Sequence, residues 1–189
     1  LHSLPDEVKS VNITMGYPIK TTLAYSFLER IISLHTHSHI KGDETRFYHD
    51  DITGLLTHPY IINSCPKAKK IAADIIANKL IMVDSAIFNN TEIIDKIFIG
   101  VSESCIEYSK YLVDVMSRVL GVIDDVAQQE YMRLIIDAIR KVTHSIANCE
   151  LEISKEIFVS LLRRHIQTLT LPYEGEPIEG VQIMGILET

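Results

Sequence analysis

The chain has 189 residues, of which 47% are hydrophobic and 23% charged, a balance typical of a folded globular domain. No apolar run reaches the length of about 20 residues that spans a bilayer, and no signal segment is visible near Leu1. Acids and bases are equal in residues 1–90, with nine of each, whereas residues 91–189 contain sixteen acids and nine bases. The net charge of -7 therefore comes from the second half, and the chain as a whole does not attract nucleic acid. We expect a cytoplasmic protein without membrane contact.

The three cysteines, Cys65, Cys105 and Cys149, are far apart and form no CxxC pair. This spacing predicts neither a zinc site nor a disulfide framework. We interpret all three as buried, reduced thiols.

Two strands are predicted at opposite ends of the chain. Residues Val11–Met15 alternate apolar and polar side chains before the break at Gly16, and Val181–Leu187 is a second apolar run. We expect these runs to pair as a small sheet, within strand segments 10–17 and 180–188. Everything between them is mostly helical, so we interpret residues 1–189 as a single, mainly α domain that is part of a larger protein.

The helices follow one another from Thr22 onward. Thr21 or Thr22 caps the first helix, which continues to Leu34. A short helix over Phe47–Leu56, capped by Asp50, is expected to end before Pro59, and Pro66 opens the next helix. An apolar run at Leu80–Val83 is a strand or a buried link. The remaining predicted helices cover 92–98 with Thr91 as cap, 105–120 before Gly121, 125–149, and a helix beginning at Ser154.

A histidine cluster follows the first helix. Imidazoles at alternate positions of an extended segment share one face and can hold a metal ion. The alternative is a solvated loop at the negative end of a helix, which suits histidine, and we favour this loop. The residues concerned are His35, His37 and His39, with His49, Asp50 and Asp51 as further ligands.

Two basic clusters are visible, Lys67–Lys70 and Arg163–His165. Their lysines and arginines could contact phosphate, but solvated helix faces explain them more simply. The chain contains no phosphate-binding loop, nucleophile elbow, HExxH motif or paired-carboxylate signature. We therefore predict no catalytic residue, no metal site and no cofactor within this chain.

A family resemblance emerges from both ends of the chain. Residues 11–18, 22–34 and 47–61 resemble the segment that enters the helical 2B-type insertion of superfamily 1 helicases. Residues 175–189 resemble the strand of helicase motif V that re-enters the second RecA-like domain. The family is that of AddB/RexB-like subunits of bacterial recombination nucleases, of the Bacteroidetes type with a C-terminal PD-(D/E)XK nuclease. Residues 65–150 match only in their helical character.

One departure from active helicases stands out. Where an active motif V carries Thr and His followed by Lys-Gly, this chain has Gly185, Ile186 and Leu187. The resemblance therefore implies a helicase-like subunit that has lost its ATPase function.

The resemblance implies a role in DNA double-strand break repair and recombination. The parent would be an ATP-dependent-type exonuclease or helicase-like protein, and this helical bundle would be a non-catalytic domain flanked by strands of the RecA-like parent. The implied partners are the rest of the parent chain, DNA through that parent, and an AddA-like helicase subunit. Gly16 and Gly185 would lie at the edge that faces DNA, where small residues allow close backbone approach.

Two other functions compete with this one. A stand-alone helical protein-interaction module would have its own start codon near Leu1. A metalloenzyme using His35, His37, His39 and His49 would bind a stoichiometric metal ion.

Overall fold

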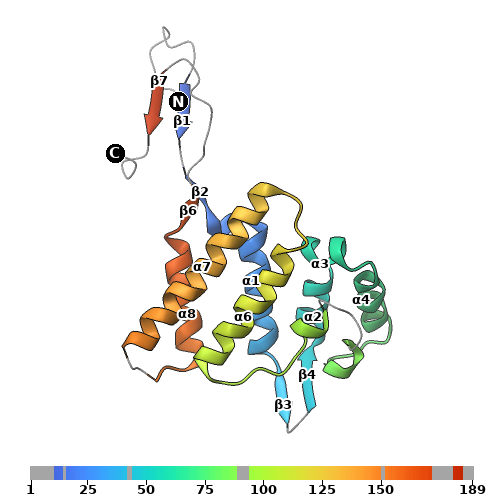
Figure 1. The fold of residues 1–189 in the computed structure, drawn as a ribbon. Coiled ribbons are helices and arrows are strands. Elements are labelled where there is room, and N and C mark those ends of the chain that lie inside the picture. Colours follow the sequence, from blue (N-terminus) through green and yellow to red (C-terminus); the bar gives the residue numbers. More distant parts are fainter. Residues whose placement is uncertain are drawn as a thin grey trace.

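The structure, a computed structural model, describes residues 11–14, 16–41, 44–88, 94–149, 152–171 and 181–184. Figure 1 shows a helical body, with one strand pair standing outside it. The described part is mainly helical, and short strands flank its helices, as the sequence predicts. The helices are α1 (Leu23–Thr36), α2 (His49–Leu56), α3 (Pro59–Ser64), α4 (Lys67–Ala77), α5 (Ile94–Ile97), α6 (Cys105–Leu120), α7 (Val126–Asn148) and α8 (Lys155–Gln167).

Helix α1 runs through the centre of the body, packed against α2 on one side and α7 on the other (Figure 1). Helices α6, α7 and α8 pack together, and α2 packs on α4. The predicted apolar stripe of the long helix is confirmed, because Ile135, Ala138 and Ile139 are buried. The largest fully buried side chains are those of Tyr108, Phe27, Phe47, Phe88 and Phe158.

Three predicted helix starts are confirmed and each is capped by a side chain, although the sequence pattern identifies only Thr22 of the three as a cap. The Thr22 side chain accepts a hydrogen bond from the Tyr25 amide at 3.2 Å, and Ser154 accepts one from Ile157 at 3.4 Å. Asp125 accepts one from the Gln128 amide at 2.8 Å. Each cap satisfies an amide donor that the first helical turn would otherwise leave unpaired.

The predicted helix over Phe47–Leu56 is wrong at its start. Helix α2 begins at His49, and the preceding strand β4 (Glu44–Tyr48) pairs with β3 (His39–Lys41) and β5 (Met82–Asp84). Burial alternates along β4, with Thr45 and Phe47 buried, which is the period of a strand. Of the two alternatives for residues 80–83, a strand or a buried link, the strand is found: β5 begins at Met82, two residues after the apolar run begins.

Proline has a different role at two positions from the one predicted. Pro59 does not merely end α2 but occupies the first turn of α3, with His58 as the cap. Pro66 precedes α4 as its cap residue instead of being its first helical residue. Proline is tolerated at both positions because the first amides of a helix have no partner within the helix. The predicted cap Thr91 lies outside the described residues.

Strand β1 (Val11–Thr14) pairs in parallel with β7 (Val181–Met184), so the predicted pairing of the two ends is confirmed over these residues. Val11 is opposite Val181 and Thr14 is opposite Met184. A short antiparallel pair, β2 (Tyr17–Pro18) with β6 (Thr170–Leu171), joins this sheet to the helical body (Figure 1). Met15 and residues 185–187 lie outside the described residues.

Candidate functional site

Three surface hollows meet at the C-terminal end of α1. They have volumes of about 500, 420 and 430 Å³, and Thr36 lines all of them. Residues of α8 also line the first hollow, and Tyr48 of β4 and Met82 of β5 line the third. This end of α1 also carries His35 and His37, so it is the place where predicted site residues and surface hollows coincide.

His35 lies in the last turn of α1 and is only 4% exposed. Its Nε2 lies 2.7 Å from the Tyr111 hydroxyl, which itself donates to the Ile97 carbonyl at 2.7 Å. Because Tyr111 has a single proton and gives it to Ile97, His35 must donate from Nε2. Burial, with Lys155 nearby, lowers the pKa of His35 to about 3. His35 is therefore a neutral core residue at neutral pH.

Aromatic rings enclose the His35 imidazole. It meets Phe47, Tyr108 and Tyr111 edge-on, with centroid separations of 5.8, 5.8 and 4.8 Å. Burial also raises the pKa of the Tyr111 hydroxyl well above its ordinary value. Neither group titrates near neutral pH, so this cluster does not exchange protons there.

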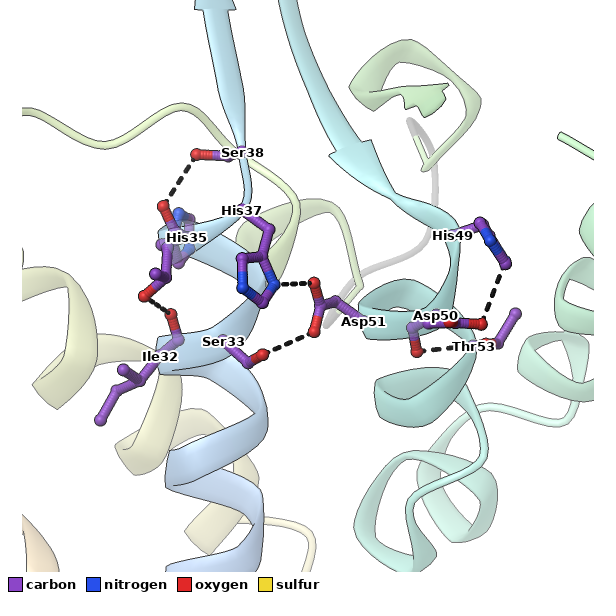
Figure 2. Close-up of polar contacts among 10 residues, drawn as sticks. Ile32, Ser33, His35, His37, Ser38, His49, Asp50, Asp51 and Thr53 are labelled. Atoms are coloured by element: carbon purple, nitrogen blue, oxygen red, sulfur yellow. Dashed lines mark hydrogen bonds and ion pairs between the residues drawn. The ribbon is translucent and has the colours of Figure 1, made fainter. Parts of the chain in front are cut away.

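His37 lies on the other side of α1, where its ring faces α2 (Figure 2). Its Nδ1 is 2.7 Å from Asp51 Oδ2, and the Ser33 hydroxyl donates to Asp51 Oδ1 at 2.6 Å. The Asp51 side chain is 11% exposed and that of His37 56%. In a nucleophilic triad the imidazole stands between the hydroxyl and the carboxylate. Here the carboxylate stands in the middle, so Ser33 is not activated and the contacts join α1 to α2.

The predicted histidine set is not brought together. His35 is helical and buried, so the favoured solvated loop is wrong for this residue, whereas His37, just after α1, and His39, in β3, are exposed. The alternative, an extended segment with one shared face, is wrong because His35 lies in the helix. His49 lies beyond Asp51 and pairs with Asp50, its Nδ1 3.1 Å from Oδ1 (Figure 2). Among the residues that the structure describes, no group of three or more His, Cys, Asp or Glu side chains is placed to hold a metal ion.

Two cations border the hollow on the α8 side. Lys155 contacts Glu103 at 2.8 Å with only 12% of its side chain exposed. Arg163 donates hydrogen bonds to the Glu29 carboxylate from two nitrogens, Nε to Oε1 at 3.0 Å and Nη2 to Oε2 at 2.7 Å. Burial alone would raise the pKa of Glu29, but the hydrogen bonds from Arg163 and Tyr25 bring it below its ordinary value. The Arg163–His165 cluster therefore contributes an ion pair between α8 and α1.

Gly16 makes a close contact within the chain. A Cβ atom placed on it would lie 2.8 Å from Thr170 Cβ and Oγ1. Its small size is thus explained by packing against β6, and its predicted contact with DNA stays a prediction. Gly185 lies outside the described residues.

The cysteine prediction is correct in part. Cys65 and Cys105 are buried, but Cys149 is exposed, because it follows the last buried member of the α7 stripe, Ile146. Sequence reasoning missed Ser33, Tyr111 and Lys155 as partners of the histidine region. Tyr111 is 76 residues from His35 along the chain, so no local spacing could have indicated their contact.

Comparisons of the chain with protein-family models, curated proteins and solved structures give no match. None of the helices in the described segments has the length and apolar content that crossing a bilayer requires.

Proposed function

We propose that this chain is a non-catalytic helical domain of an AddB-like helicase-nuclease subunit that acts in DNA double-strand break repair and recombination. The observation that carries the proposal is the parallel pairing of β1 with β7. Parallel sheets occur almost only where further strands and helices cover them, and an isolated strand pair is marginally stable in water. A sheet of this kind is what an insertion would share with a larger parent sheet.

The helical body supports the same proposal. The helices that follow β1 form the core and lead to β6, which pairs with β2 at the end of the body nearest the β1–β7 pair (Figure 1). Entry and exit thus lie side by side, as insertion into another domain requires. The polar cluster of Ser33, His37 and Asp51 joins two helices, and its geometry suits a scaffold better than a reaction centre.

The first test is the coding sequence on both sides of this segment. A continuous reading frame with a helicase-like region upstream and a nuclease motif downstream is the expected result. A start codon directly before Leu1 and a stop codon directly after Thr189 would contradict the proposal and favour a stand-alone interaction module.

The second test removes the body from the intact parent subunit. Residues 17–171 are replaced by a Gly/Ser linker of about 12 residues, because neighbouring parallel strands need a crossover connection of about that length. We expect the parent to fold and keep its nuclease activity on single strands, but to lose processing of duplex ends with its helicase partner. A control carries the exposed substitution Lys20→Gln in the complete body. Full duplex processing by the excised protein would overturn the proposed role.

A further inference from the structure

Helix α4 presents a basic outer face that the functional proposal does not yet use. Four exposed lysines, Lys67, Lys69, Lys70 and Lys79, lie on the helix or just after it, and Asp74 is the one acid in residues 66–81. The segment thus carries a net charge of about +3 in a chain of net charge -7. In Figure 1, α4 lies at the outer edge of the body beside α2 and α3, away from α7 and α8.

The charge of these lysines is not neutralised within the described residues. No ion pair there includes any of the four. Six of the thirteen other lysines and arginines in the described residues do contact a carboxylate: Arg46, Arg118, Arg133, Arg140, Lys155 and Arg163. The α4 face is therefore a local source of positive potential on an acidic molecule.

Folding alone gives a poor account of these lysines. Lys67, Lys69 and Lys70 occupy the first turn, which has no acidic residue and no side-chain cap. Positive charge is unfavourable there, because the helix dipole already places positive charge at this end. Lys79 has a φ of 52°, in the left-handed region that favours glycine. Lysine thus occupies positions where local backbone and helix energetics disfavour it.

The lysines of the first turn lie on the exposed side of α4. Ala68, Ala72 and Ile75 turn inward and are buried, whereas Ala73, Asp74, Ile76 and Ala77 are exposed beyond that turn, Ile76 at 63%. The basic area is therefore concentrated at the N-terminal end of the helix, ahead of Asp74 and Ile76. Lysine binds a phosphate as a compact point charge without base-specific geometry.

We infer that the α4 lysine face, Lys67, Lys69, Lys70 and Lys79, contacts the phosphate backbone of DNA independently of sequence. This inference rests on the proposed function, which brings the domain to DNA ends. It assigns the contact to one helix of an otherwise acidic chain. The interaction is weak in isolation because only a few phosphates are neutralised.

The test measures fluorescence anisotropy of a labelled DNA duplex with a single-stranded tail, titrated with the chain between about 20 and 200 mM NaCl. The variant K67Q/K69Q/K70Q removes three charges while retaining side-chain length and helix propensity. We expect at least a tenfold loss of affinity at low salt. We also expect the slope of log K against log salt to fall in magnitude by roughly 2 to 3, at about 0.9 per lost phosphate contact.

The matched control is K41Q/K110Q/K141Q, which removes three exposed lysines from other surfaces with the same change in net charge. It should change affinity less than twofold. Equal loss in both variants, no loss in the α4 variant, or no binding by the wild type at low salt would each overturn the inference. Tighter binding of polyglutamate than of DNA would also overturn it and assign the face to an acidic protein.

The outcome is separable from that of the proposed function. Excision of the body from the parent tests the domain as a whole, whereas the lysine variants leave the body intact. Loss of duplex processing on excision, combined with unchanged DNA binding in the α4 variant, would leave the proposed function standing and remove the DNA contact alone.

Discussion

Two histidines at the end of α1, only two residues apart, have opposite environments. His35 is 4% exposed among aromatic rings, whereas the His37 side chain is 56% exposed and faces Asp51. A helix turns by about 100° per residue, so positions two apart point in nearly opposite directions. Alternate spacing, which puts side chains on one face of a strand, separates them on a helix.

The two environments also differ in what they stabilise. The His35 side is built from packed rings with one hydrogen-bond chain through Tyr111 to Ile97. The His37 side is a polar bridge in which Asp51 binds groups from the last turns of α1. Burial in the core dominates the stability of the His35 side, whereas the His37 side depends on a partly solvated polar contact. Substitutions should therefore change stability far more on the His35 side.

The largest expected effect is that of His35→Ala. The substitution leaves a cavity among Phe47, Tyr108 and Tyr111 and removes the hydrogen bond to Tyr111. We expect the free energy of unfolding in urea to fall by about 3 kcal/mol. His39→Ala, at an exposed position of β3, is the control and should change it by less than about 0.5 kcal/mol. Equal effects at both positions would show that the core assignment of His35 is wrong.

Acid should destabilise the protein through its buried histidines. Burial lowers the pKa of His35 to about 3, and burial near Arg30 lowers that of His58 to about 4. Both rings are neutral in the folded state, while the unfolded chain takes up protons below about pH 6.5. Their stabilisation is therefore complete above pH 6.5 and is lost as the pH falls toward the folded pKa values.

The acid effect is measured as a slope. Each histidine should lower the free energy of unfolding by up to about 1.4 kcal/mol per pH unit as the pH falls from about 6 to 4. Urea unfolding of the wild type and of His35→Gln at several pH values isolates one contribution, since glutamine does not titrate. We expect His35→Gln to remove about half of the histidine-dependent slope, and an unchanged slope would contradict a neutral, buried His35.

On the polar side, Asp51→Asn should have an intermediate effect. Asparagine keeps the size of the side chain but removes the charge that both Ser33 and His37 contact, in the first turn of α2. We expect the free energy of unfolding, measured in urea, to fall by about 1 to 2 kcal/mol. The charge-assisted hydrogen bonds and the favourable contact of the carboxylate with the helix dipole are both weakened. Asp50→Asn, one residue earlier with a side chain that is 70% exposed, is the control.

Sequence patterns predicted those parts of the fold that local rules determine. The cap at Thr22, the helix starts near Asp125 and Ser154 and the stripe of α7 follow from hydrogen-bonding groups and helical period. The pairing of β1 with β7 followed from two similar apolar runs. The last two residues of strand β4, Phe47 and Tyr48, were mistaken for helix because they precede α2 without a break, and only pairing with β5 distinguishes them.

The site was less predictable than the fold. The spacing of the histidines was compatible with one shared face, but His35 contacts Tyr111 of α6 and His37 contacts Asp51 of α2. Ser33 lies 18 residues from Asp51, a distance at which no helix or strand period applies. The environment of each side chain is set by packing of separate helices, and that information is not contained in local spacing.

The smallest expected effect is that of His37→Ala. More than half of the ring is exposed, so water and salt screen its contact with Asp51. We expect the free energy of unfolding to fall by about 0.5 kcal/mol or less. The matched change on the buried side, His35→Ala, should cost several times more. A double variant with Asp51→Asn isolates the pair: if the contact is a simple bridge, His37→Ala should have almost no further effect once the carboxylate is gone. A loss above about 1 kcal/mol in that background would mean that His37 stabilises α1 as the residue ending the helix, independently of Asp51.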